Sequence, residues 1–85
     1  MGEYSITFAR SARRELEALS PGNVRRILPR IEALADQPRP SGCRKLRGEQ
    51  SLWRIRVCEY RVIYGILDPE RILDVVAVRH RSEAY

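Results

Sequence analysis

Apolar and basic side chains alternate in LWRIRV, residues 52–57. Successive side chains of a β-strand point to opposite faces, so its tryptophan, isoleucine and valine would share one face, and Arg54 and Arg56 the other. The apolar face needs a covering layer, whereas the guanidinium groups need solvent or an anionic partner. The stretch therefore predicts a sheet with one packed face and one open, basic face.

Two further strands follow this stretch. Alternation and β-branched residues predict three consecutive strands at roughly Leu52–Cys58, Tyr60–Leu67 and Ile72–Val78. The tetrapeptide VCEY joins the first two, and DPER, residues 68–71, fits a type I turn with aspartate first and proline second. Connections this short join antiparallel neighbours, so we expect a three-stranded meander.

The first half of the chain predicts one strand and two helices. YSITFA, residues 4–9, alternates like a half-buried strand. RSARRELEAL, residues 10–19, has apolar residues at helical spacing, with Ser11 as a candidate N-cap. A second apolar stripe starts after Ser20 and continues in phase past Pro29, which predicts one helix bent in the turn before that proline.

This order of elements predicts an α+β fold in which two helices pack on one sheet face and the first strand pairs within the same sheet. With 85 residues the chain is expected to be a single domain, residues 1–85, with a thin core that leans on a partner. Its start is polar and no long apolar run follows, so we expect no signal peptide and no membrane span. Cys43 and Cys58 lack the spacing of a metal site, which predicts reduced thiols in a cytoplasmic protein.

Basic residues are concentrated in one part of the chain. The sequence holds 16 basic and 11 acidic residues, and every basic residue except Lys45 is an arginine. Residues 39–61 contain seven basic and two acidic residues, so their net charge of +5 equals that of the whole chain. Such a concentration suits a polyanion, and arginine binds phosphate with two parallel hydrogen bonds. A two-residue period would gather five arginines on one surface: Arg54, Arg56, Arg61, Arg79 and Arg81.

Two plainer explanations stand beside phosphate binding. A genome rich in arginine codons accounts for the number of arginines, although not for their position. A basic sheet face can also be merely solvated, or it can dock an acidic segment of another protein. Tyr85 favours a nucleic acid, because a ring beside arginines can stack on a base, but a tyrosine at a chain end can equally be a frayed terminus.

Several segments, in this order, resemble the RelE-type toxins of bacterial and archaeal toxin–antitoxin systems. They are KLRG, WRIRV, EYRVIYGILD, ILDVVAV and RHRSEAY, and the resemblance extends from Tyr4 to Tyr85. The combined pattern is typical of the RelE/ParE superfamily, and the RxRSExY ending points to its RelE side. The resemblance implies the RelE-like microbial RNase fold, with the order of elements given above.

For activity, the resemblance implies that the protein enters the ribosomal A site and cuts mRNA there, using no metal ion or other cofactor. A ribose 2′-OH attacks the adjacent phosphate, and Arg56 and Arg61 would stabilise the charge of the phosphorane. Arg79 would lie by the leaving 5′-oxygen, and Tyr85 would stack on the base so that the 2′-OH is in line. The positions that match the family's catalytic residues are Arg54, Arg56, Arg61, Arg79 and Tyr85.

The chain departs from the family at the residue that would act as general base. The best-known member has lysines where this chain has Arg54 and Arg56, and an arginine does not release its proton near neutral pH. His80 titrates in the right range and is a possible catalytic residue, although strand alternation points it away from Arg79 unless the strand has ended. Rate enhancement by charge stabilisation alone is another alternative. The remaining candidate bases are Glu49, Glu59 and Glu83.

Other basic residues are expected to contact RNA, with a solvated loop as the alternative for those in and beside KLRG. The expected partners are a cognate antitoxin, which forms a hetero-oligomer with an otherwise monomeric toxin, and a ribosome with bound mRNA. Two alternatives use the same fold: a ParE-like toxin that poisons DNA gyrase, and a degenerate toxin that only binds RNA or an antitoxin. The expected RNA-binding residues are Arg44, Lys45, Arg47 and Arg81.

Overall fold

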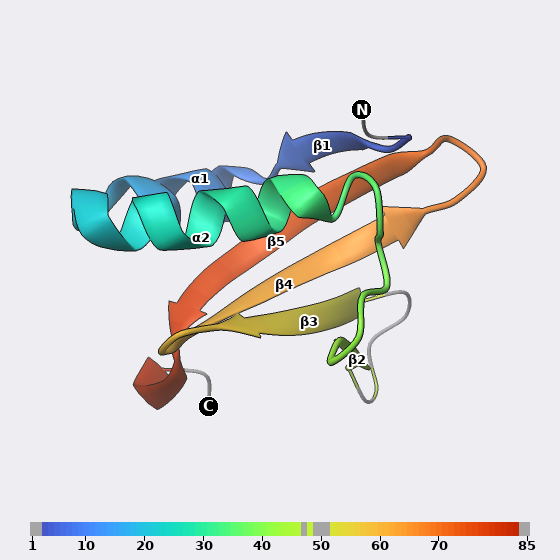
Figure 1. Cartoon of the computed structure of the whole chain (residues 1–85). Helices are drawn as coiled ribbons and strands as arrows, with labels where there is room; N and C mark the ends of the chain where they lie inside the picture. Colours follow the sequence, from blue (N-terminus) through green and yellow to red (C-terminus); the bar gives the residue numbers. More distant parts are fainter. Residues whose placement is uncertain (1–2, 47, 49–51, 84–85) are drawn as a thin grey trace.

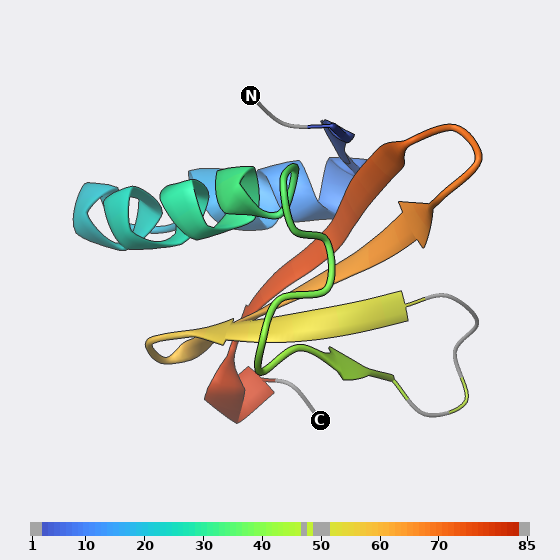
Figure 2. The ribbon, with the colours of Figure 1, turned by 45° about the vertical axis from the view of Figure 1, so that its right-hand side comes forward.

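Two helices lie on one face of a five-stranded sheet in the computed structural model, which describes residues 3–46, 48 and 52–83 (Figures 1 and 2). The strands lie in the order β1-β5-β4-β3-β2, with β1 parallel to β5 and all other neighbours antiparallel. The predicted α+β fold and its meander are confirmed, and the first strand pairs within the same sheet. The elements in chain order are β1 (Ser5–Phe8), α1 (Arg10–Glu17), α2 (Pro21–Ala33), β2 (Arg44–Lys45), β3 (Leu52–Val57), β4 (Tyr60–Leu67), β5 (Ile72–His80) and the 3-10 helix η1 (Arg81–Glu83).

The edge strand β2 is an element that the sequence does not predict. Its two residues are too few to show alternation, so the sequence predicts a loop for this segment. Arg44 lies opposite Arg54 in β3, and the backbone N–H of Leu46 continues the ladder by donating to the carbonyl of Leu52 at 2.9 Å. As a result, Arg44 is held beside β3 by backbone pairing.

The starts of the two helices differ in how they are capped. Ser20 caps α2 as predicted, because its side chain accepts a hydrogen bond from the backbone N–H of Asn23 at 3.4 Å. The predicted cap of α1 is wrong: its N-cap is Ala9, and Ser11 instead donates to the carbonyl of Val76 at 2.9 Å. Helix α2 continues through the exposed Pro29, as predicted. Among the described residues, no helix is long and apolar enough to cross a membrane.

The core lies between the helices and the face of the sheet that carries Ile55 and Val57. Tyr64 is its largest fully buried side chain, and its hydroxyl donates to the carbonyl of Pro38 at 2.7 Å. Burial raises the pKa of this hydroxyl well above its ordinary value. Trp53 packs half-buried against this core, as the alternation predicts. The buried residues of the core are Ala12, Ile27, Ile31, Leu34, Ile55, Val57, Val62, Tyr64, Ile66, Leu73, Val75 and Val78.

Strand β5 contains a β-bulge that changes which residues face the helices. Tyr64 lies opposite Val75, whereas its neighbour Ile63 lies opposite Ala77, so Val76 has no counterpart on β4. Before the bulge, odd-numbered residues such as Val75 face the core. After it, odd-numbered residues face away from the helices, and Arg79 is among them. A strictly alternating strand could not both bury Val75 and expose Arg79 on the other face.

Beyond the bulge, α1 covers the edge of β5 that β1 leaves open. Strand β1 pairs with β5 only as far as Val75. The carbonyl of Val76 then accepts the hydrogen bond from Ser11, and the backbone N–H of Val78 donates to Glu15 Oε1 at 2.8 Å. Side chains of α1 therefore satisfy strand groups that would otherwise have needed another strand.

Arg39 ties the loop after α2 to the far end of the sheet. Its guanidinium lies 5.0 Å from the centre of the Trp53 ring and 3.0 Å from Asp68 in the β4–β5 turn. The hydroxyl of Tyr4 also donates to Asp68, at 2.6 Å. These hydrogen bonds, first from Tyr4 and then from Arg39, lower the pKa of the Asp68 carboxyl.

Candidate nucleic-acid interface

The face of the sheet opposite the helices, here named the arginine face, carries Arg44, Arg54, Arg56, Arg61 and Arg79. Three of them form a row across adjacent strands: Arg56 in β3 lies opposite Arg61 in β4, which lies opposite Arg79 in β5. Directly opposed residues of an antiparallel pair point to the same face, with their Cβ atoms about 5 Å apart. Three arginine side chains thus leave adjacent strands from directly opposed positions on one face of the sheet.

Arg61, at the centre of this arginine row, is the most enclosed of the three. It is half-buried, and its Nε and Nη1 atoms are shielded from solvent. Like charges placed opposite one another destabilise a sheet, so the row lowers the stability of the free protein. An anion that reaches the row is therefore attracted by three guanidinium groups, of which that of Arg61 is the least accessible to water.

Arg79 is held in place by a contact with α1. Its Nε donates to Glu15 Oε2 at 3.2 Å, while the other carboxylate oxygen of Glu15 accepts the backbone N–H of Val78. Both side chains of this ion pair are partly exposed, at 46% for Arg79 and 31% for Glu15. The pair thus orients Arg79 without removing it from solvent, and an exposed pair of this kind contributes about 1 kcal/mol or less to stability.

The β3–β4 hairpin encloses a pocket of about 370 Å³ at one end of the arginine row, here named the hairpin pocket. Arg56, Arg61 and Arg81 contribute three cations to its lining, and Glu59 is its carboxylate. Glu59 Oε1 lies 2.9 Å from Nε of Arg81, and the carbonyl of Glu59 accepts the backbone N–H of Arg81 at 2.8 Å. These two contacts hold η1, and with it Arg81, against the hairpin.

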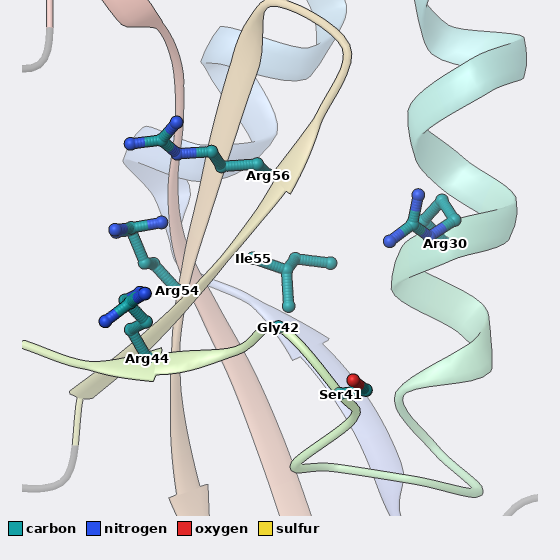
Figure 3. Close-up of a pocket in the computed structure, with 7 residues that line it drawn as sticks. All are labelled: Arg30, Ser41, Gly42, Arg44, Arg54, Ile55 and Arg56. Carbon is teal, nitrogen blue, oxygen red and sulfur yellow. The ribbon is translucent and has the colours of Figure 1, made fainter.

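A second pocket, of about 360 Å³, lies along the outer edge of β3 and is here named the edge pocket (Figure 3). Arg44, Arg54 and Arg56 form one side of it, and Arg30 of α2 stands across Ile55 on the other side. Sequence reasoning does not assign Arg30 to any site, because on a helix it reads as one more solvated charge. Arg30 can be recognised as a candidate site residue only in the folded structure, where α2 lies beside β3.

The structure does not bring every predicted site residue to the arginine face. Lys45 lies opposite Trp53, with its Nζ 6.0 Å from that ring, and so shares the other face with Trp53 rather than joining Arg44. Arg81 has left the strand and reaches the hairpin pocket from η1. Arg47 and Tyr85 lie outside the described residues, as does Glu49.

His80 lies on the helix side of the sheet. It is opposite Tyr60, and the two rings meet edge to face with centres 5.3 Å apart. Its Nδ1 lies 2.8 Å from Oγ of Ser82 and accepts the backbone N–H of Ser82 at 3.2 Å. Strand alternation holds through His80, so its ring is on the opposite face from the arginine row.

Comparison with known proteins gives this geometry a context. The sequence profile of the ParE toxin of type II toxin–antitoxin systems, parDE, matches residues 6–85. The chain belongs to the RelE/ParE family of toxins. A putative RelE-like toxin protein of Escherichia coli is 31% identical to this toxin over 96% of this chain and 90% of that protein. The putative toxin RelE1 of Methanocaldococcus jannaschii is 26% identical over 98% of this chain and 96% of that protein.

Solved structures extend the likeness to the whole fold of the toxin. The archaeal RelE–RelB complex from Pyrococcus horikoshii contains a chain with a TM-score of 0.82 and 25% identity, covering 96% of this chain and 99% of that one. The toxin–antitoxin complex RelBE2 from Mycobacterium tuberculosis gives a TM-score of 0.83 and 27% identity, covering 93% of this chain and 99% of that one. The order of helices and strands is therefore that of RelE structures.

Proposed function

We propose that this RelE/ParE toxin is a ribosome-dependent endoribonuclease that cuts mRNA in the A site and so inhibits translation. Support comes from the arginine row, in which Arg56, Arg61 and Arg79 lie opposite one another on three neighbouring strands. This is the single observation that carries the proposal. The likeness to proteins named RelE supports the same activity.

In the proposed reaction, the ribose 2′-OH attacks the adjacent phosphorus and the bond from phosphorus to the 5′-oxygen breaks. The products are a 2′,3′-cyclic phosphate and a 5′-OH, so a proton leaves the 2′-oxygen and another reaches the 5′-oxygen. Arg56 and Arg61 stabilise the additional negative charge of the phosphorane, and Arg79 neutralises the leaving oxygen. Tyr85 stacks on the base and keeps the 2′-OH in line. No step of the proposed reaction uses a metal ion.

Glu59 is our candidate for the general base. Its carboxylate lines the hairpin pocket beside Arg56 and Arg61, whereas His80 lies on the other face. A positioned general base typically contributes about 10²–10⁴-fold to a rate. Glu59→Gln is therefore expected to slow single-turnover cleavage by at least about 10²-fold. If Glu59→Gln keeps the rate of the parent, Glu59 is not the general base.

The decisive experiment maps mRNA 5′ ends in a translating lysate with and without the toxin. The proposal expects new 5′-OH ends inside translated codons, and none when translation is blocked before elongation. The double variant Arg61→Ala, Arg79→Ala is expected to produce no such ends while remaining folded by circular dichroism. If the double variant cleaves mRNA as the parent does, the assignment of Arg61 and Arg79 as catalytic residues is wrong.

A gyrase poison is the second candidate, and it is favoured by one observation: the matching family profile is described as that of ParE. A ParE-like activity predicts trapped double-strand DNA breaks and intact mRNA after expression in cells. The arginine face favours the nuclease, because single-stranded RNA is bound through its backbone by basic grooves. A toxin that binds RNA with a steep salt dependence but yields neither product would instead be a degenerate binding module.

An antitoxin is the expected partner in either case. The neighbouring structures include complexes of RelE toxins with RelB antitoxins. For this toxin we propose that an acidic antitoxin segment covers the arginine face or the helices. The toxin alone is then a cytoplasmic monomer, and a mixture with its antitoxin elutes as a hetero-oligomer in size-exclusion chromatography. Relief of growth arrest by coexpression of the antitoxin tests the pair in cells.

A further inference from the structure

The edge pocket lies where the sheet is incomplete. Strand β2 pairs with β3 at Arg54 and Trp53, and among the described residues no strand pairs with β3 on that side from Arg54 towards the hairpin. Backbone groups in an antiparallel strand point alternately to its two sides, and those of Arg56 point away from β4, as those of Arg54 do. Figure 3 shows the resulting opening, with the loop at Ser41 and Gly42 below it and α2 beyond it.

The charge of the edge pocket is uniformly positive. Arg30, Arg44, Arg54 and Arg56 line it, together with Ser41, Gly42 and Ile55, and none of these lining residues is acidic. The opposite edge of the sheet differs, since Asp74 lies there beside Thr7 of β1 and Glu15 of α1 accompanies Arg79. An anionic chain that crosses the arginine face is therefore attracted towards β3.

The edge pocket and the hairpin pocket share one residue, Arg56. Arg54 and Arg56 lie two positions apart on one strand, which separates them by about 7 Å. This spacing allows the two arginines to contact successive phosphates of an extended nucleic-acid strand. Arg30 lies beyond these two arginines, across Ile55 in Figure 3. The nucleic-acid strand would pass Arg30 after it leaves the β-sheet.

We infer that the RNA leaves the reaction centre over the edge of β3, and that the edge pocket holds the phosphate that flanks the scissile one. Arg54 and Arg44 contact this flanking phosphate from the arginine face, and Arg30 contacts the backbone as it turns towards α2. The inference rests on the proposed nuclease function for its ligand, single-stranded RNA, and it adds Arg30 as a binding residue outside the reaction centre.

The test measures binding of a short single-stranded RNA to the full chain at several salt concentrations. Every ribose of the probe carries a 2′-O-methyl group, so that no cleavage can occur. Each phosphate contact on a single strand contributes about −0.7 to the slope of log affinity against log salt. Arg30→Gln is expected to weaken binding regardless of base sequence and to reduce the magnitude of that slope by about 0.7.

Arg25→Gln is the matched control, because Arg25 lies on the same helix but lines the groove between α1 and α2 instead. It removes the same charge and is expected to leave the slope unchanged. A second variant, Ser41→Glu, adds a carboxylate to the exposed floor of the edge pocket and is expected to weaken RNA binding without removing any arginine.

A probe with one neutral methylphosphonate linkage identifies the contacted phosphate. Moved along the probe, the linkage is expected to weaken binding to the parent at the phosphate that Arg30 contacts and to have no further effect there on Arg30→Gln. Equal slopes for Arg30→Gln and the parent would overturn the inference even if mRNA cleavage is observed. If Arg30→Gln loses binding to an oligoglutamate peptide but keeps the RNA binding of the parent, the inference is overturned in favour of an acidic protein ligand. If the slopes change as expected but no mRNA cleavage is observed, the edge pocket still binds RNA and the proposed nuclease function is wrong.

Discussion

The two faces of the sheet are made by alternate residues of the same strands, yet they differ in what they do for the protein. The face under the helices buries its side chains, and Tyr64, Leu73 and Val75 are fully enclosed there. The arginine face places like charges opposite one another, which costs stability. One face therefore stabilises the fold, while the other retains an unfavourable arrangement of charges, as expected of a binding surface. This contrast leads to separable effects of mutation.

The largest effect on stability is expected on the covered face. Leu73→Ala removes a fully buried side chain from β5 and is expected to cost about 2–5 kcal/mol, because the surrounding core cannot collapse fully into the space. Urea unfolding followed by circular dichroism measures the loss. Leu67→Ala is the matched control, since Leu67 is 47% exposed, and it is expected to change stability by less than about 0.5 kcal/mol. Similar losses for both leucines would contradict this account of the core.

On the arginine face we expect the opposite: a large loss of activity without a loss of stability. Arg61→Ala removes the central cation of the arginine row and is expected to slow mRNA cleavage by about 10²–10³-fold. The free energy of unfolding is expected to stay equal or to rise by up to about 1 kcal/mol, because repulsion from Arg56 and Arg79 is relieved. Single-turnover cleavage and urea unfolding of the same preparation measure the two quantities. A variant that loses activity only because it unfolds would contradict the separation of the two faces.

A smaller effect appears at alkaline pH. The pKa of Tyr64 is raised in the folded protein, mainly by burial, so its hydroxyl ionises in the unfolded chain first. Its contribution to stability is therefore fully present below about pH 10, the ordinary tyrosine value, and is lost as the pH rises towards the higher folded value. Tyr64→Phe is expected to reduce this alkaline loss and to cost about 1 kcal/mol at neutral pH, because the carbonyl of Pro38 loses its donor. Unfolding curves at pH 8 to 11 test both expectations, and an unchanged alkaline slope in Tyr64→Phe would contradict them.

Sequence reasoning reached the fold because its signals are local. Alternation in LWRIRV, the DPER turn and the cap at Ser20 each depend on a few neighbouring residues, and all three have their counterparts in the structure. The residue pattern also indicated which side of β3 is covered. What it could not supply was pairing between distant segments, such as the parallel pairing of β1 with β5 and the two-residue strand β2.

The bulge at Val76 shows why the candidate site was only partly predictable. Simple alternation places Val75, Ala77 and Arg79 on one face, and on that basis the arginine row would require an exposed Val75. The extra residue lets β5 bury Val75 and still direct Arg79 to the arginine face. No pattern within ILDVVAVRH distinguishes the bulged residue from its neighbours, since either valine could take that position. Arg30 was missed for the same reason, because its role depends on the packing of α2 beside β3.

The smallest effect is expected in the hairpin that joins the two arginine-bearing strands. Cys58 has a φ of 56°, a left-handed conformation that favours glycine, and its side chain is exposed. Cys58→Gly relieves this strain but increases the freedom of the unfolded chain, so it is expected to change stability by less than about 1 kcal/mol in the stabilising direction. Cleavage is expected to be unchanged, because the arginines on both sides keep their backbone pairing.

Cys58→Ala is the control: it removes the thiol but keeps the left-handed strain. If Cys58→Gly stabilises no more than Cys58→Ala does, the turn is not strained in solution. A loss of activity in both variants would instead give the thiol a part in the hairpin pocket, which its place in the lining permits.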